Sequence, residues 1–204
     1  MNITVELQNL SIGYDKIPLI SDLNYKFTNK IYGLLGESGV GKTTLLRTIA
    51  GLNKPLSGKI IRDVNTDIYM MHQQYTSFDW LTCLDNILIT AKVNHIKIDD
   101  ELKDKAMDAL SSVGLVNDYE KYPTELSGGM KQRLALARTL FMQPKIILMD
   151  EPLSALDEET REKMQDLIIE NHTQTNNTII LITHSKSEAK KMCDMIINLT
   201  RKGI

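Results

Sequence analysis

The sequence predicts a mixed α/β domain with a mainly parallel sheet, and three observations support this. Short apolar runs typical of buried strands alternate with segments of helical periodicity, as in sheets whose strands are joined by helices. The length of 204 residues suits one domain with a sizeable core. With 42% hydrophobic and 25% charged residues, the composition disfavours a disordered chain or a coiled coil. We therefore expect a single domain over residues 1–204.

Three β-rich runs are expected at the start of the chain, over residues 3–7, 23–28 and 31–35. Gly13-Tyr14-Asp15 supplies turn material between the first two runs. The third run ends in a glycine cluster, after which a helix is expected over residues 43–50, ended by Gly51. Beyond it, residues 59–62 and 68–71 are expected to pair as a hairpin.

The middle of the chain is predicted to be helical, from Leu84 to Gly114. Further helices are expected over residues 127–142 and 158–170. Apolar strands are expected over residues 146–149, 179–183 and 195–199. Because these strands alternate with helices, they should form a parallel sheet.

Charge and cysteine content narrow the class of protein. The 24 Lys and Arg residues nearly balance the 26 Asp and Glu residues, so no nucleic-acid partner is expected. The apolar runs are far shorter than the roughly 18 residues that span a bilayer. Glu6 and Gln8 lie where a signal peptide needs an apolar core, so we expect a cytosolic chain. Cys83 and Cys193 form no CxxC or Cys/His cluster, which favours two reduced, packed thiols.

A glycine-rich loop carries the most specific signal. Gly36-Glu37-Ser38-Gly39-Val40-Gly41-Lys42-Thr43 fits G-x-x-x-x-G-K-[ST] and lies between an expected strand and an expected helix. Such a loop can turn backbone amides toward phosphates, Lys42 can reach the β- and γ-oxygens, and the Thr43 hydroxyl can ligate Mg²⁺. That context favours a phosphate loop over a glycine-rich turn that binds nothing.

Two carboxylates, Asp150 and Glu151, follow the apolar strand of residues 146–149. Ligands of open α/β sheets bind at the carboxyl ends of the strands. One carboxylate can position Mg²⁺ there while the other orients or deprotonates an attacking water. A helix-capping or solvent-facing pair is the alternative, and these two residues alone leave both possibilities open.

Two further segments are ambiguous when taken singly. Ser127-Gly128-Gly129 opens a helix with the groups of an anion site, but an ordinary N-cap serine explains it better. His184 ends a strand, and Ser185 and Glu188 have the spacing of a capping box for the next helix. A lone histidine in such a place is more often structural than functional.

Taken in order, these segments resemble the ATP-binding subunit of ATP-binding cassette (ABC) transporters over essentially the whole chain. They are GESGVGKTT, Gln73, LSGGMKQR, IILMDEP, SALD and His184. The sequence LSGG ahead of a strand that ends in Asp-Glu-Pro is close to diagnostic of this family. The combination therefore favours functional roles for Ser127 and His184 over the purely structural roles considered above. Residues 78–87 and 126–133 are similar to importers of the nitrate, sulfonate and taurine type. The resemblance implies a P-loop NTPase core (1–73 and 143–204) with an antiparallel β edge, and a helical subdomain of about residues 74–142.

The resemblance also implies roles for single residues, with ATP and Mg²⁺ as ligands. Tyr14 would stack on adenine, where a surface turn tyrosine is the alternative. The phosphates would be held by Gly36, Glu37, Ser38, Gly39, Val40, Gly41, Lys42, Thr43 and Thr44. Thr43, Gln73 and Asp150 would serve Mg²⁺, Gln73 would also contact the attacking water, Glu151 would be the general base, and His184 would contact the γ-phosphate. Ser127 and Gly129 would reach the nucleotide of a second copy, and Asp157 would lie across that dimer interface.

Partners follow from the same resemblance. A head-to-tail homodimer would power an integral-membrane permease for import, with an extracytoplasmic solute-binding protein, and would place the chain on the cytoplasmic face of the membrane. An exporter of the lantibiotic type and a soluble Fe–S assembly ATPase are the alternatives. Tyr75, Phe78 and Trp80 are expected to receive the permease, unless Trp80 packs inside the helical subdomain. Because the chain stops at Ile204, soon after its last strand, the C-terminal regulatory domain of some importers is expected to be absent.

Overall fold

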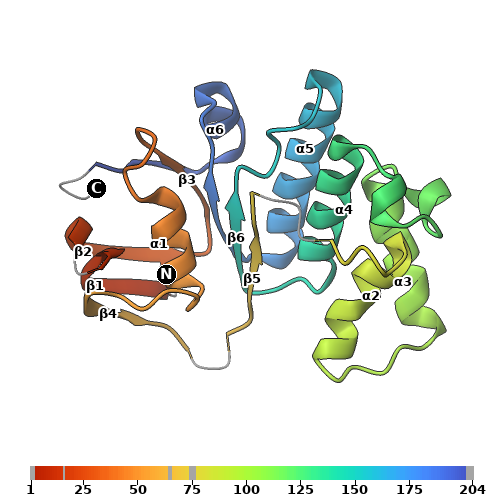
Figure 1. The fold of residues 1–204 in the computed structure, drawn as a ribbon, viewed down its shortest axis with the longest axis horizontal. Coiled ribbons are helices and arrows are strands. Elements are labelled where there is room, and N and C mark those ends of the chain that lie inside the picture. The colour runs from red at the N-terminus through yellow and green to blue at the C-terminus, as the bar shows by residue number, and fades with distance from the viewer. Residues whose placement is uncertain (1–2, 16, 64–65, 74–76, 201–204) are drawn as a thin grey trace. The chain divides into compact units, whose positions relative to one another are not determined.

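A computed structural model describes residues 3–15, 17–63, 66–73 and 77–200 (Figure 1). The chain divides into two compact units. The core unit comprises Met1–Met70, Pro144–Glu151 and His172–Ile204, and the helical unit comprises Met71–Gln143 and Pro152–Asn171. Residues 152–171 thus group with the helical unit, whereas the sequence placed them in the core. The side chain of Gln132 explains this grouping in part, because it accepts a hydrogen bond from the backbone N–H of Ala155.

An antiparallel sheet forms the N-terminal part of the core unit. Its strands are β1 (Ile3–Tyr14), β2 (Ile17–Thr28) and β4 (Ser57–Ile61), in the order β2-β1-β4. β1 is longer than expected, because Asn9 adopts a φ of 47° in an irregular stretch that interrupts the alternation of apolar residues without ending the strand. Gly13 and Tyr14 therefore lie in β1 instead of in a turn, and Tyr14 pairs with Ile17.

The second sheet is the expected parallel one, with the order β5-β6-β7-β3-β8. Its strands are β5 (Ile68–Met71), β6 (Ile146–Asp150), β7 (Thr178–Ile182), β3 (Ile31–Leu35) and β8 (Met195–Asn198). The pairs β3–β7, β3–β8 and β6–β7 are parallel, and every residue of β3, β6 and β7 is buried. The expected hairpin of residues 59–62 and 68–71 is wrong, because β4 pairs with β1 while β5 joins the other sheet.

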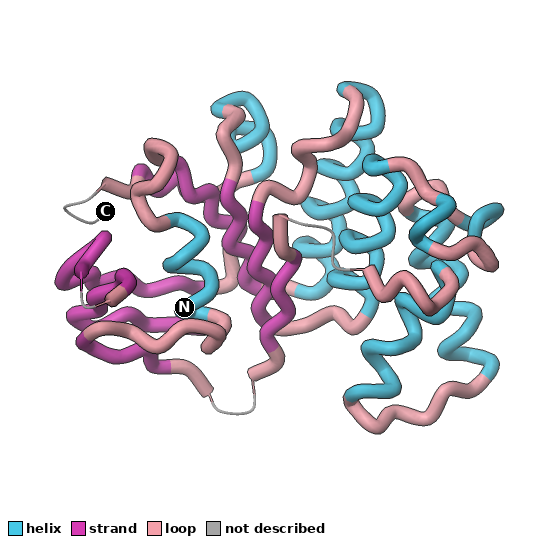
Figure 2. Tube along the Cα trace, viewed as in Figure 1, coloured by secondary structure: helices cyan, strands magenta, loops and turns pink. Residues whose placement is uncertain are grey.

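Helix α1 (Lys42–Ile49) packs against strands of both sheets, β1, β6 and β7 (Figure 2). Its Leu45, Leu46 and Ile49 are buried in one apolar cluster with side chains of β1, β2, β3, β6, β7 and β8. Helix α6 (Lys186–Met192) follows β7. Since α1 starts directly after the glycine-rich loop, this core fixes the base of that loop.

The helical unit contains α2 (Cys83–Val93), α3 (Asp100–Ser112), α4 (Gly128–Phe141) and most of α5 (Glu158–Thr175). Two short 3₁₀ turns, Val116–Asp118 and Pro123–Glu125, precede α4. Residues 94–99 divide the expected helical stretch into α2 and α3, and His95 there has a φ of 57°. In the described part of the chain, no helix combines the length and apolar character needed to cross a bilayer.

Candidate active site

The glycine-rich loop leaves β3 at Gly36 and closes on its own lysine. Lys42 is 7% exposed, and its Nζ donates hydrogen bonds to the carbonyl oxygens of Gly36 (2.8 Å) and Glu37 (2.9 Å). Gly36 has a φ of 152°, and a Cβ there would lie 2.5 Å from the carbonyl oxygen of Leu199. Glycine is therefore required at this turn, and the lysine ammonium is held at the loop itself.

The start of α1 differs from that of the other helices. Side-chain oxygens of Thr82, Asp99, Ser127, Asp157 and Ser185 accept hydrogen bonds from backbone N–H groups in the first turns of α2 to α6. The N-cap of α1 is Gly41, with a φ of 110°, and no side chain in the described part of the chain caps it. The first N–H groups of a helix lack intrahelical acceptors, so this end suits an anion beside the Lys42 ammonium.

Tyr14 lies next to the same helix end. Its hydroxyl is 3.0 Å from the hydroxyl of Thr44, and more than half of the residue is exposed. The hydrogen bond holds the phenol at the start of α1, while the exposed ring is available for stacking. Tyr14 is a surface residue, as the surface turn tyrosine considered from the sequence would be, but it lies in β1 and not in a turn.

Asp150 and Glu151 differ in their surroundings. Asp150, the last residue of β6, is 3% exposed. Glu151 has a left-handed φ of 51°, unusual for a residue with a side chain, and its N–H donates to the carbonyl oxygen of Ile182 in β7. Its Oε1 lies 3.0 Å from Nε2 of His184. Because an ionised carboxylate only accepts hydrogen bonds, His184 donates from Nε2.

Parallel pairing explains why these groups meet. β3, β7 and β6 are neighbouring parallel strands, so their carboxyl ends share one edge of the sheet. Gly36 follows β3, Glu151 follows β6, and His184 follows β7. The structure thus brings the phosphate loop, the two carboxylates and the histidine to the same edge.

The oxygen groups at this edge fit a magnesium ion by their chemistry. Thr43 is exposed at the start of α1, which packs against β6, and Asp150 ends β6 with a buried carboxylate. A hydroxyl and a carboxylate are ligands that Mg²⁺ prefers, and a buried carboxylate favours a nearby cation. No cluster of three or more His, Cys, Asp or Glu side chains suited to a metal ion occurs among the described residues, at this edge or away from it.

The helical unit carries the Ser127 segment. The Ser127 Oγ accepts a hydrogen bond from the N–H of Met130 (3.3 Å), so it is the N-cap of α4, and its own proton remains for donation. A Cβ added at Gly128 would meet nothing within 4 Å. At Gly129 it would lie 3.4 Å from the carbonyl oxygen of Ala155. The face at Gly128 is thus open in the single chain.

Asp157 lies at the start of α5. The Thr160 N–H donates to its Oδ1 (3.0 Å), and this hydrogen bond is the main cause that lowers its pKa below the ordinary value. Gln132, 1% exposed on α4, accepts a hydrogen bond from the Ala155 N–H (2.9 Å). Arg161 donates to the carbonyl oxygens of Leu153 and Leu156. These contacts join the Ser127 helix to the segment that precedes Asp157.

The sequence reasoning missed Gln132 and Arg161. Only the polarity of Gln132 among the apolar residues of α4 could have indicated a buried role. Gln73 is exposed in the helical unit, and its proposed role is taken up below.

A loop at residues 78–82 presents Trp80, which is 74% exposed. The alternative that Trp80 packs inside the helical subdomain is therefore wrong. The Phe78 and Trp80 ring centroids lie 5.4 Å apart, and the Arg138 guanidinium lies 5.4 Å from the Phe78 centroid. Burial lowers the pKa of Arg138. Tyr75, the third expected member of this patch, lies outside the described residues.

Asn86, whose role the sequence reasoning also missed, holds the loop of residues 78–82 in its conformation through side-chain hydrogen bonds. It is fully buried, and its Oδ1 accepts from the Phe78 N–H (2.8 Å). Its Nδ2 donates to the carbonyl oxygens of Phe78, Leu81 and Thr82, at 3.1, 2.9 and 2.9 Å. One amide side chain thus satisfies four backbone groups and fixes the conformation in which Trp80 projects outward.

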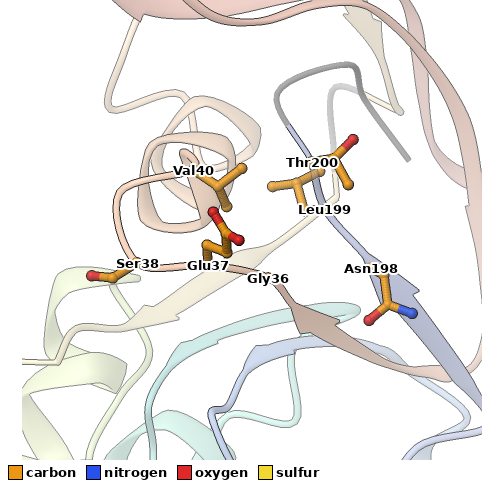
Figure 3. Close-up of a pocket in the computed structure, with 7 residues that line it drawn as sticks. All are labelled: Gly36, Glu37, Ser38, Val40, Asn198, Leu199 and Thr200. Atoms are coloured by element: carbon orange, nitrogen blue, oxygen red, sulfur yellow. The ribbon is translucent and has the colours of Figure 1, made fainter.

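A cavity of about 310 Å³ lies beside the phosphate loop (Figure 3). Its lining consists of Gly36, Glu37, Ser38 and Val40 from the loop, and Asn198, Leu199 and Thr200 at the end of β8. Neither Lys42 nor Thr43 lines it. We therefore do not assign this cavity to the phosphates, which the Lys42 ammonium and the start of α1 suit better.

The fold and these groups define a P-loop ATPase domain, and comparison with known proteins gives its family. The family described as ABC transporter matches residues 21–154. The chain is 40% identical to the taurine import ATP-binding protein of Roseobacter denitrificans over 95% of this chain and 76% of the relative. It is 36% identical to the aliphatic sulfonates import ATP-binding protein of Zymomonas mobilis over 99% and 84%. The chain belongs to the ABC transporter family.

A solved structure supports the same assignment. The dimeric ATP-binding cassette MJ0796, in a post-hydrolysis state bound to ADP and Pi, matches with a TM-score of 0.88 and 28% identity. The match covers 98% of this chain and 96% of that one. Three sulfate/thiosulfate import ATP-binding proteins, from Rhizobium meliloti, Mesorhizobium japonicum and Agrobacterium fabrum, are 33–34% identical and longer, and this chain spans 58–62% of them. The expectations of an ABC-type ATPase, and of a likeness to sulfonate and taurine import ATPases, are confirmed.

Proposed function

We propose that this ATPase works as a homodimer that closes around two ATP molecules and drives import through a membrane permease. The observation that carries the proposal is the shared sheet edge, where the phosphate loop lies with the hydrogen-bonded pair Glu151 and His184. The names of the sulfonate and taurine relatives support import, in preference to the exporter and Fe–S alternatives.

Phosphate binding is assigned to the loop of residues 36–43 together with Thr44. Lys42 would exchange its two carbonyl acceptors for phosphate oxygens, and the uncapped start of α1 would supply N–H donors. Tyr14, tethered to Thr44, would stack on the adenine ring. This contact needs no hydrogen bond to the base.

Hydrolysis is assigned to Glu151 as the general base. Its carboxylate can accept a proton from a water aligned with the γ-phosphate, and the hydrogen bond from His184 Nε2 orients that carboxylate. His184, more than half exposed, can also donate to the γ-phosphate. Thr43 and Asp150, with Gln73, would hold Mg²⁺, which neutralises phosphate charge when bound. Gln73 would also contact the attacking water.

The second ATP contact comes from the helical unit of the other copy. The Ser127 hydroxyl keeps its proton for donation, Gly128 presents an open face, and Gly129 follows in the first turn of α4. These groups suit a phosphate brought by a second copy. Asp157, held in the adjoining segment through Gln132 and Arg161, would lie at the same dimer interface.

Permease binding is assigned to the exposed loop of residues 78–82. Trp80 is 74% exposed and its ring packs against that of Phe78, which the Arg138 guanidinium covers, so this loop has the composition of an interface anchor. Through this contact the chain would lie at the cytoplasmic face of the membrane, and a solute-binding protein would serve the permease outside. Gln73, a few residues before the loop, would report nucleotide binding to it.

Two variants test the ATPase and the permease contact separately. Lys42→Ala should abolish ATP binding or turnover, while Lys59→Ala, an exposed lysine of β4, should not; near-normal ATPase in Lys42→Ala would contradict the site. Phe78→Ala/Trp80→Ala should keep basal ATPase within a few-fold of normal and lose co-purification with a permease in cell membranes. Uptake of labelled taurine, sulfonate or sulfate in cells, which the double variant should lose, tests the direction; normal uptake would contradict the permease contact.

A further inference from the structure

Hydrogen bonds among Thr183, Ser185 and Glu188 hold the segment that carries His184, and we call these three residues the polar relay. Thr183 is 4% exposed, and its Oγ1 accepts a hydrogen bond from the Ser185 N–H (3.0 Å). The same hydroxyl donates to Oε2 of Glu188. Its single proton must point this way, because an ionised carboxylate only accepts. Residues on both sides of His184 are thereby connected to one carboxylate of α6.

This arrangement differs from the capping box that the sequence predicts. Half of the box forms, since Glu188 N–H donates to the Ser185 Oγ (3.2 Å). In the other half, the glutamate carboxylate would accept from the Ser185 N–H at the helix surface. Instead, the Thr183 hydroxyl takes that N–H, and the Glu188 carboxylate turns inward to Thr183.

Burial of the Glu188 carboxylate beside Thr183 is unfavourable in free energy. Glu188 is 7% exposed, and its Oε1 is buried without a hydrogen bond from any described residue. Burial of an ionised carboxylate that is only partly hydrogen-bonded is unfavourable. Helix capping does not require this cost, because Ser185 already caps α6. The position of Glu188 therefore calls for an explanation other than stability of the helix.

We propose that Glu188 is a positioning residue for His184, an inference that rests on the proposed ATPase function. The His184 side chain is 55% exposed, so packing alone does not fix its direction. The backbone on either side of it is fixed by the Thr183 hydroxyl, and that hydroxyl is oriented by Glu188. The relay thus holds the imidazole where Nε2 reaches Glu151 at 3.0 Å.

Two substitutions break the relay at different points. Thr183→Val removes the hydroxyl and keeps the shape, while Glu188→Leu removes the carboxylate and fills the buried space. Each should lower kcat by about tenfold to a hundredfold, since small misplacements of catalytic groups have effects of this size, with KM for ATP within about twofold. Glu188→Leu should change stability little, because removal of a partly unsatisfied buried charge offsets the loss of the acceptor of the Thr183 hydroxyl. Thr183→Ser should restore most of kcat.

A matched control lies on the same strand. Thr178 is fully buried at the other end of β7, where its Oγ1 donates to the Thr28 carbonyl oxygen (3.0 Å) or the Thr4 hydroxyl (2.8 Å). Thr178→Val should lower the melting temperature with kcat unchanged. An equal fall of kcat in Thr178→Val and Thr183→Val would overturn the proposal, because loss of any buried hydroxyl would then suffice.

A second readout separates this proposal from the function on which it rests. In histidine-labelled protein, the NMR signal of the His184 ring can be assigned by its loss in His184→Ala. Glu151→Gln should shift that signal in the wild type and leave it nearly unchanged in Glu188→Leu. A full shift in Glu188→Leu would show that His184 still meets Glu151 and would overturn the relay. Normal turnover in His184→Ala would instead contradict the proposed role of His184.

Discussion

Nε2 of His184 lies 3.0 Å from Oε1 of Glu151, so a side chain after β7 is hydrogen-bonded to one that follows β6. The histidine donates this hydrogen bond and the carboxylate accepts it. Glu151 reaches this partner from a left-handed backbone conformation, with a φ of 51°. Such a conformation is unfavourable for a residue with a Cβ and is found preferentially at functional sites.

Glu151→Gln should keep ATP affinity and lower turnover by about a hundredfold or more, because the amide keeps the shape but cannot accept a proton as a base. Dimers should then accumulate with ATP and Mg²⁺, which light scattering after gel filtration would detect. Glu162→Gln, at an exposed glutamate of α5, is the matched control and should behave as the wild type. Retained turnover with only monomer in solution would refute the assignment of Glu151.

Ser127→Arg should abolish the ATP-dependent dimer while each monomer still binds one ATP, because the residue serves the nucleotide of the other copy. The bulky cation replaces an exposed N-cap on α4, so the fold should persist. Mixing Ser127→Arg with Lys42→Ala should restore some dimer, since one composite site of each mixed pair is intact. If the Ser127→Arg monomer bound ATP as weakly as the Lys42→Ala monomer does, this would contradict the proposal that Ser127 serves the nucleotide of the other copy.

Asn86→Leu should lower the free energy of unfolding by about 3 kcal/mol, because it leaves several backbone groups of residues 78–82 without their buried partner. Urea titration followed by Trp80 fluorescence measures both stability and the exposure of the loop. Asn94→Ala, at an exposed asparagine capping the same helix, should change stability by less than about 0.5 kcal/mol. Similar losses in the two variants would show that Asn86 has no special role.

Both thiols should be slow to react in the folded protein. Burial raises the pKa of Cys83 to about 11 and that of Cys193 to about 12, from an ordinary 9.0. At pH 8 the Cys83 thiolate should be about a hundredfold scarcer than in the unfolded chain. Reaction with a disulfide reagent, with and without guanidinium, measures this. Since the unfolded thiols lose protons first, stability should fall as pH rises above about 9. Fast reaction of both thiols in the native protein would contradict the burial of Cys83 and the partial burial of Cys193.

Local sequence patterns predicted those parts of the fold that depend on neighbouring residues. The phosphate loop, β6 and the N-cap Ser127 could be located because turn chemistry, apolar runs and capping act over a few positions. The pairing of strands could not be predicted in this way. The expected hairpin of residues 59–62 and 68–71 is not formed, because no local pattern shows that β4 pairs with β1. The relay through Thr183 was also hidden, since its residues have the spacing of an ordinary capping box.

The contact between Gly36 and Leu199 has a consequence for the order in which the protein is made. Strand β3, which leads into the phosphate loop, lies between β7 and β8, and both of these come far later in the sequence, from Thr178 onward. A nascent chain leaving the ribosome therefore carries the complete loop sequence long before the neighbours of that loop exist. The site for ATP is therefore formed only after β7 and β8 have been made and have paired with β3.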